Sequence, residues 1–142
     1  MNQKMTIEPM FTFDRQCEQA LELYKKAFGA KVTVLMRFSD ANPQDLPPAY
    51  NAEKDVNLVF HAQMMIGEQR ILLCDNLFND LPRGTSVYPV MTFETADEVT
   101  AAYNALAEDA TIINPPTEAT YTFAASLVDK FGIHWDLMTA VK

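Results

Sequence analysis

The segment PMFTFD at residues 9–14 recurs 80 positions later as PVMTFE at residues 89–94. Between residues 9 and 30, six of 22 positions match their counterparts, where ordinary amino-acid usage gives about one or two matches. In both copies an alternating apolar segment precedes an amphipathic one, which predicts a strand followed by a helix. The spacing is too long for a solenoid and indicates two fused modules. The identical pairs are Pro9/Pro89, Thr12/Thr92, Phe13/Phe93, Glu18/Glu98, Ala27/Ala107 and Ala30/Ala110.

The first copy predicts a strand, a helix and three further strands. Residues 7–13 alternate as a strand does, and apolar spacing from Cys17 predicts a helix that starts near Arg15. Asp14 is the expected N-cap, and Gly29 suits the position after the helix C-terminus. A long polar loop, of a kind that often forms a lid, is expected at residues 39–56. The three further strands are expected at residues 31–38, 57–67 and 70–75.

The second copy predicts the same order of elements. Residues 88–94 form its first expected strand, and Thr95 with Glu98 forms a capping box for a helix that starts near Ala96. The sequence NPPTEA at residues 114–119 is expected to be a loop, because it holds two prolines. The remaining strands are expected at residues 111–113, 121–128 and 132–138.

Length and charge restrict the function classes. At 142 residues the chain is expected to form one domain, residues 1–142, with a real core. A net charge of −8 argues against nucleic-acid partners and anionic membrane surfaces. The sequence shows neither a membrane-spanning apolar run nor a signal-peptide pattern, so a cytoplasmic protein is expected. Cys17 and Cys74 are expected to be free, mostly buried thiols.

The last expected strand separates polar from apolar side chains. Because neighbouring residues on a strand point to opposite faces, Ile133, Trp135 and Leu137 share one face. The other face carries a histidine, an aspartate and a methionine, which raises the question of a chemical site. These three residues are His134, Asp136 and Met138.

Several segments together resemble the PhnB-like branch of the vicinal oxygen chelate superfamily, which includes glyoxalase I, bleomycin-resistance and extradiol dioxygenase proteins. They are FDRQCEQALELYKKAFGA, LMRFSD, FHAQMMIG, LLCD and DKFGIHW, and they cover nearly the whole chain in the expected order. The resemblance implies an α+β fold of two fused β-α-β-β-β modules, at residues 5–78 and 86–142. It further implies that these modules form a curled eight-stranded sheet around a central cavity, within a homodimer.

The resemblance also implies where a divalent metal would bind, with two side chains from each module. Counted from Gly132 of the D-x-x-G motif, one ligand position falls at Asp136. The first-strand positions fall at Glu8 and Tyr88, and the fourth falls at Leu72, or at Cys74 if the register slips. Two carboxylates, a phenol and an aliphatic group make a poor site for a transition metal. No cofactor is therefore expected, and a metal, if one binds, would use Glu8 and Asp136.

Glu8, Asp136 and His61 are the catalytic candidates. If the two carboxylates lie close together across the cavity, they repel and the pKa of one rises, as a general acid or base requires. Alternatively, they point to opposite rims and are simply solvated. His61 shares a strand face with Gln63, and it is either a polar contact to a ligand or a hydrogen-bonded strand histidine.

The ligand-binding candidates are polar or aromatic residues expected near the cavity. Arg37 could bind an anion, or could pair with an acid such as Asp40 at the end of its strand. An anionic ligand would use Arg37 and His61, whereas a flat aromatic one would contact tyrosine, phenylalanine and methionine side chains. The full set of ligand-binding candidates is Arg37, Tyr88, Gln63, His134 and Met138.

Two function classes follow. The first is a small-molecule-binding protein of the glyoxalase/bleomycin resistance type, without a tight catalytic metal. The alternative is a lyase, isomerase or dioxygenase-type enzyme that uses a metal or its carboxylates. Members of the PhnB-like branch often carry a methyltransferase label, but the four scattered glycines form no loop that would hold a methyl donor.

Overall fold

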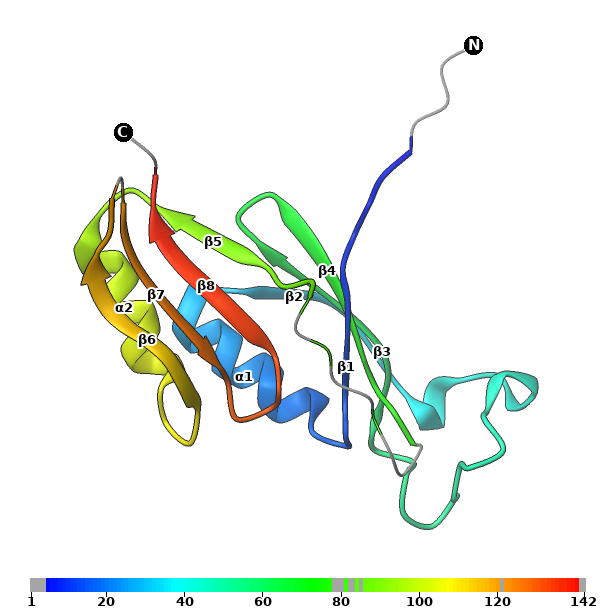
Figure 1. Cartoon of the computed structure of the whole chain (residues 1–142). Coiled ribbons are helices and arrows are strands. Elements are labelled where there is room, and N and C mark those ends of the chain that lie inside the picture. Colours follow the sequence, from blue (N-terminus) through cyan, green and yellow to red (C-terminus); the bar gives the residue numbers. More distant parts are fainter. Residues whose placement is uncertain (1–4, 78–80, 82–83, 85, 121, 141–142) are drawn as a thin grey trace. The chain divides into compact units, whose positions relative to one another are not determined.

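The structure, a computed structural model, describes residues 5–77, 81, 84, 86–120 and 122–140. Within these residues the order of strands and α-helices is β-α-β-β-β, followed by a second β-α-β-β-β (Figure 1). This order confirms the predicted α+β fold of two modules. The first module contains β1 (Met10–Phe13), α1 (Cys17–Phe28), β2 (Lys31–Arg37), β3 (Val59–Ile66) and β4 (Gln69–Asp75). The second contains β5 (Val90–Phe93), α2 (Ala96–Leu106), β6 (Thr111–Glu118), β7 (Phe123–Val128) and β8 (His134–Thr139).

The strands form two four-stranded sheets with the same topology. The first has the order β1-β4-β3-β2 and the second the order β5-β8-β7-β6. In each sheet the first strand of the module pairs in parallel with the last one, and the other pairs are antiparallel. The chain divides into two compact units, Met1–Leu21 with Gly29–Leu81, and Glu22–Phe28 with Pro82–Lys142. No helix in the described part of the chain is long and apolar enough to cross a membrane.

The strand registers support the internal repeat. In the first sheet Met10 lies opposite Leu72, and in the second sheet Val90 lies opposite Asp136. The backbone N–H of Leu72 donates to Pro9 O, and that of Asp136 donates to Pro89 O. Since Pro9 and Pro89 are repeat partners, Leu72 is the counterpart of Asp136. The register therefore favours Leu72 over Cys74 as the fourth predicted position.

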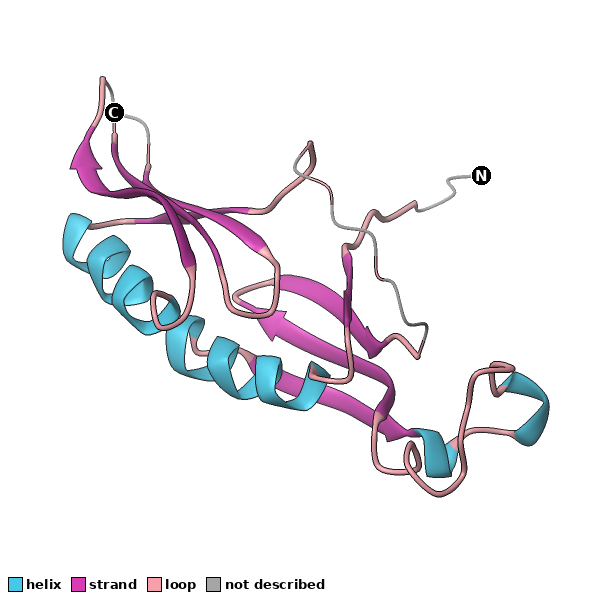
Figure 2. Ribbon diagram, turned by 60° about the horizontal axis from the view of Figure 1, so that its bottom comes forward, coloured by secondary structure: helices cyan, strands magenta, loops and turns pink. Residues whose placement is uncertain are grey.

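The core of the second unit lies between its sheet and the helices. Trp135 is fully buried, and its ring contacts Tyr24 and Phe28 of α1, at centroid distances of 5.3 and 4.7 Å. Figure 2 shows α2 as a coil beside the strands of this unit, and α2 contributes the buried Val99 and Leu106. These contacts group residues 22–28 with the second unit. The helices therefore pack on the face of β8 that Trp135 shares with Ile133 and Leu137.

The start of α1 differs from the sequence prediction. The helix begins at Cys17, and the carboxylate of Asp75, at the end of β4, accepts a hydrogen bond of 2.8 Å from the Cys17 N–H. Asp75 also accepts a hydrogen bond of 2.9 Å from the Val59 N–H. The predicted N-cap, Asp14, is wrong, because a residue 58 positions away along the chain reaches the helix N-terminus. In the second module the predicted capping box of Thr95 and Glu98 is confirmed.

Strand β6 is longer than predicted. It runs from Thr111 to Glu118 and includes Pro115 and Pro116, in the segment expected to be a loop. Proline is tolerated here because β6 is the edge strand, where one row of N–H groups needs no partner, and because the pairing shifts between Asn114 and Thr117. The strand predicted from residue 121 begins at Phe123, and Tyr121 itself lies outside the described residues.

The two helices end with the same backbone conformation. Gly29, predicted to follow α1, has a φ of 67°, and its repeat partner Asp109 has a φ of 56°. This left-handed region costs free energy for a residue with a Cβ atom, and glycine adopts it freely. The second module thus has an aspartate, Asp109, at the position where the first module has a glycine, Gly29.

Asp109→Gly is therefore expected to increase the free energy of unfolding by about 0.5–1 kcal/mol, because it relieves the left-handed strain. Urea denaturation followed by circular dichroism would measure the change. The matched control is Asp97→Gly, which places glycine inside the first turn of α2 and should lower stability by about 1 kcal/mol. A loss of stability in Asp109→Gly would contradict this account of the helix end.

Candidate functional site

A polar cluster lies on the face of the second sheet opposite to Trp135. The hydroxyl of Ser126 on β7 donates to Asp136 Oδ1 on β8 over 2.6 Å. His134 Nε2 lies 3.2 Å from the same carboxylate oxygen and 3.1 Å from Ser126 Oγ. The ring of Tyr88 stacks on the His134 imidazole at a centroid distance of 3.9 Å and an interplanar angle of 16°. Tyr88, Ser126, His134 and Asp136 are called the β8 cluster below.

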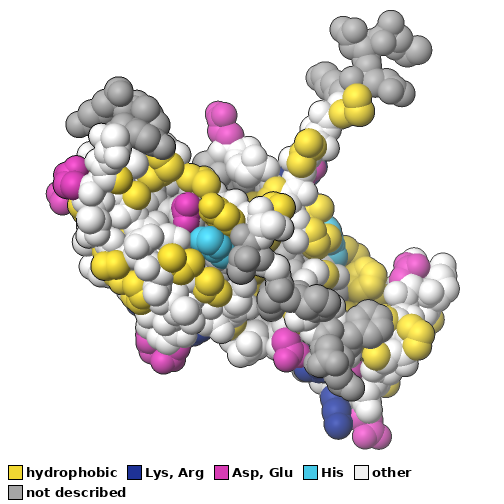
Figure 3. Space-filling model, viewed as in Figure 1, with side chains coloured by type: hydrophobic (Ala, Val, Ile, Leu, Met, Phe, Trp, Pro, Cys, Tyr) yellow, Lys and Arg dark blue, Asp and Glu magenta, His cyan; other side chains and the backbone are white. Residues whose placement is uncertain are grey.

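The chemistry of the cluster fixes the histidine tautomer. An ionised carboxylate only accepts hydrogen bonds, so the proton of a neutral His134 lies on Nε2, which donates to Asp136. The other ring nitrogen, Nδ1, is buried and has no hydrogen-bond partner in the described part of the chain. The Asp136 carboxylate is 32% exposed, so it is held in place by two neighbours and still reaches solvent. Figure 3 shows a histidine and an acidic side chain among hydrophobic ones on this face.

Ser126 was not identified from the sequence. Its neighbours in ASLV are small or apolar, so the segment carries no sign of a polar site. Strand alternation predicts that Ser126 and Leu127 point to opposite faces of the sheet. Only the pairing of β7 with β8 places Ser126 opposite Asp136. Ser126 could have been identified as a site residue only if the register of β7 and β8 had been known. Met138, another ligand-binding candidate, is half-buried on β8, two residues beyond Asp136.

In the first unit, Glu8 lies in an extended segment before β1 and pairs with Arg70 on β4. Arg70 Nη2 donates to one carboxylate oxygen over 2.7 Å, and Arg70 Nε donates to the other. The guanidinium holds the pKa of the Glu8 carboxyl below its ordinary value, mainly through these hydrogen bonds. Arg70 was not predicted as a partner. It makes Glu8 an ionised carboxylate, so Glu8 does not have the raised pKa considered for one of the carboxylates.

His61 and Gln63 lie on β3 in the first unit. The side-chain amide of Gln63 donates to His61 Nε2 over 3.0 Å, which supports the prediction that the two residues share a face. A pocket of about 460 Å³ adjoins the Glu8–Arg70 pair, at the β3–β4 turn. A second pocket, of about 630 Å³ at the start of α2, contains no predicted site residue.

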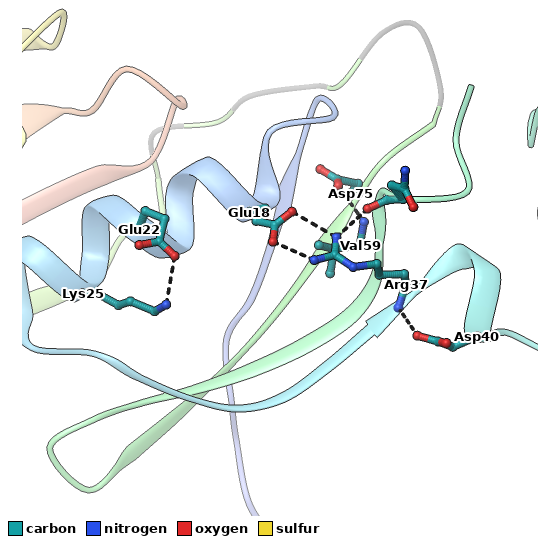
Figure 4. Close-up of polar contacts among 8 residues, drawn as sticks. Glu18, Glu22, Lys25, Arg37, Asp40, Val59 and Asp75 are labelled. Atoms are coloured by element: carbon teal, nitrogen blue, oxygen red, sulfur yellow. Dashed lines mark hydrogen bonds and ion pairs between the residues drawn. The ribbon is translucent and has the colours of Figure 1, made fainter. Parts of the chain in front are cut away.

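Arg37 is engaged by the protein itself. Its guanidinium binds both carboxylate oxygens of Glu18 on α1, at 3.0 and 2.7 Å, and donates to the carbonyl of Asn57 (Figure 4). Asp40 instead accepts from the Arg37 backbone N–H over 2.9 Å. These contacts support the alternative of a strand-end ion pair, with Glu18 as the partner of the guanidinium. The ion pair weighs against a role for Arg37 in binding an anion.

The structure brings some of the predicted site residues together. Tyr88, His134 and Asp136 meet in the second unit, whereas Glu8 and His61 belong to the first unit and lie in separate contacts there. The idea that Glu8, His61 and Asp136 face one cavity stays a prediction.

The predicted metal ligands do not fit a metal site. Glu8 is neutralised by Arg70, Leu72 has no donor atom, and Tyr88 stacks on His134. In the described residues no group of three histidine, cysteine, aspartate or glutamate side chains could hold a metal ion. A transition metal needs three or four nitrogen, oxygen or sulfur ligands. The donor set at the four superfamily positions falls short of this.

Comparisons with solved structures show the same fold at low sequence identity. A putative 3-demethylubiquinone-9 3-methyltransferase, PhnB protein, from Bacillus cereus is 22% identical, with a TM-score of 0.79 over 96% of this chain and 100% of that one. A protein from Pseudomonas aeruginosa is 21% identical, with a TM-score of 0.80 over 96% and 98%. A glyoxylase/bleomycin resistance protein/dioxygenase domain from Frankia sp. EAN1pec is 12% identical, with a TM-score of 0.66 over 99% and 95%.

No curated protein sequence matches this chain. The model of one protein family, however, matches residues 6–137, which cover most of both modules and the whole β8 cluster. Together with the duplicated β-α-β-β-β order, this match assigns the family. The chain belongs to the Glyoxalase/Bleomycin resistance protein/Dioxygenase superfamily.

Proposed function

We propose that this protein is a PhnB-like member of the superfamily that binds a small organic molecule without a tight catalytic metal. The observation that carries the proposal is the β8 cluster, where a half-exposed carboxylate is held by Ser126 and His134 beside a stacked tyrosine. A carboxylate that served only to support the core would be buried, whereas this one still reaches solvent. The donor set at the superfamily's metal positions supports binding over metal-dependent catalysis.

The second candidate is an enzyme that uses carboxylates as acid and base. It is favoured by the hydrogen-bonded His61, if this residue shares a cavity with Asp136. The ion-paired Glu8, whose pKa lies below its ordinary value, does not favour it. Methyl transfer is not proposed, because the sequence has no glycine-rich turn for a methyl donor. We further propose that the protein acts as a cytoplasmic homodimer, in which a second copy covers the exposed edges of the sheets.

A screen of small organic fragments would test the binding function. Protein labelled with ¹⁵N should show saturable chemical-shift changes at strands β5, β7 and β8 with some fragments. Tyr88→Ala should abolish these changes, because it removes the aromatic surface of the cluster. Tyr103→Ala, on α2, is the matched control and should leave them unchanged. A screen without any hit on these strands would contradict the proposal.

Metal analysis gives an independent prediction. Protein purified without chelators is expected to contain no stoichiometric zinc, iron or nickel, because Leu72 offers no ligand and Arg70 occupies Glu8. Inductively coupled plasma mass spectrometry would measure the content. One metal ion per chain that is lost in Asp136→Ala would contradict the metal-free part of the proposal. Light scattering on the same sample would test the dimer, and a monomer would count against it.

A further inference from the structure

The hydrogen bonds of the β8 cluster leave one side of the carboxylate available. Asp136 Oδ1 receives both the Ser126 hydroxyl and His134 Nε2, whereas Oδ2 has no hydrogen bond in the described part of the chain. With Oδ1 engaged twice, the carboxylate is fixed in orientation before any ligand arrives. Oδ2 is therefore a preorganised acceptor on a half-exposed group. It can bind only a partner that donates a hydrogen bond.

The tyrosine of the cluster provides a flat surface next to this acceptor. One face of the Tyr88 ring lies on His134, and 39% of the residue remains exposed. Val90, the first residue of β5, follows Tyr88 by two positions and lies opposite Asp136, so Tyr88 and Asp136 are diagonal neighbours. Val90 is 49% exposed and extends the apolar surface. A ring stacked on Tyr88 can thus carry a substituent that reaches Asp136.

The charged groups around the cluster determine whether a cationic or an anionic substituent is favoured there. Strands β5, β7 and β8 contain no lysine or arginine, and the chain has a net charge of −8. In the first unit, Arg37 and Arg70 are already paired with Glu18 and Glu8. An anion at the β8 cluster would meet the Asp136 carboxylate without any neutralising cation from these strands. A cation would gain a charge-assisted hydrogen bond.

We propose that the ligand of the β8 cluster is a flat aromatic molecule that carries a protonated amine or amidine. Its ring stacks on Tyr88, and its cationic N–H group donates to Asp136 Oδ2. Ser126 and His134 are positioning residues that hold the carboxylate. This inference rests on the proposed binding function, and it replaces the anionic ligand considered from the sequence with a cationic one.

Three naphthalene compounds that differ only in charge test the inference. They are naphthalene-2-carboxamidine, which is cationic, the neutral 2-carboxamide and the anionic 2-carboxylate. Titrations followed by ¹⁵N chemical shifts of β5, β7 and β8 should show that the amidine binds about tenfold more tightly than the amide, with the carboxylate weakest. Equal binding of all three compounds, or strongest binding of the carboxylate, would overturn the proposed ligand class.

Variants separate the two contacts. Asp136→Asn keeps an acceptor for Ser126 and should reduce amidine affinity to that of the amide, with little change in stability. Tyr88→Leu should weaken the amidine and the amide by the same factor. Asp97→Asn, on the exposed start of α2, is the charge-matched control and should change neither. A preference for the amidine that survives in Asp136→Asn would overturn the assigned contact.

Ser126→Ala tests the positioning role. Without the hydroxyl the carboxylate is less ordered, so the amidine should lose affinity while the amide, which relies on stacking, should not. Ser126→Thr keeps the hydroxyl and should restore the preference for the amidine. Equal loss for both compounds would indicate a merely structural role for Ser126. If the fragment screen yields anionic binders at the same strands, the ligand class fails while the binding function stands.

Discussion

Replacing Asp129 with alanine is expected to lower the free energy of unfolding by about 3–5 kcal/mol. Asp129 lies in the turn between β7 and β8 and is 3% exposed. Its Oδ2 accepts from the Tyr24 hydroxyl over 2.7 Å and from the Trp135 indole N–H over 2.9 Å. Its Oδ1 accepts from the backbone N–H groups of Phe131 and Ile133, at 2.9 and 3.1 Å. Alanine would leave four donors without this partner.

Urea denaturation would measure the loss, with the fluorescence of Trp135, the single tryptophan of the chain, as the signal. Asp129→Asn should lose less, about 2 kcal/mol, because its amide oxygen still serves one pair of donors while its NH₂ group faces the other pair. Asp97→Ala is the exposed control and should change stability by at most about 0.5 kcal/mol. If Asp129→Ala proved as stable as this control, the central role of the carboxylate would be refuted.

Asp75→Ala is expected to cost about 2–4 kcal/mol, because it leaves the backbone N–H groups of Cys17 and Val59 without their partner. Burial raises the pKa of the Asp75 carboxyl above its ordinary value, although hydrogen bonds from the backbone oppose the shift. A carboxyl with a raised pKa in the folded protein binds its proton more tightly there than in the unfolded chain. The stabilisation that comes from this tighter proton binding is fully present below the ordinary pKa. It is lost as the pH rises through the raised pKa.

The stability difference between the native protein and Asp75→Ala should therefore widen as the pH falls from neutral through the raised pKa. Urea midpoints measured at a series of pH values would show this trend. Asp45→Ala, at an exposed position, is the control and removes a carboxylate without burial. A difference that narrows on acidification would mean that Asp75 is stabilised as a charged group, contrary to the dominant effect of burial.

Each of the two carboxylates has a partner that lies far away in the sequence, Tyr24 for Asp129 and Cys17 for Asp75. Local sequence patterns do not reveal these two contacts. Asp129 was recognised as part of a D-x-x-G motif, but its bonds to Tyr24 and Trp135 depend on how α1 packs against β8. Asp75 replaced the predicted cap, Asp14, for the same reason. In contrast, the capping box of Thr95 and Glu98 was correct, because both residues lie within one helical turn.

The sequence alone determined the order of elements, the internal repeat and the faces of β8. These features follow from periodicity along the chain, which depends only on backbone geometry. The tertiary structure decided which side chains meet. The pairing of β7 with β8 brought Ser126 to Asp136, and the position of β4 beside the segment before β1 gave Glu8 its partner Arg70. Side-chain partners across a sheet are set by strand register, and register depends on the packing of the whole core, which no short segment encodes.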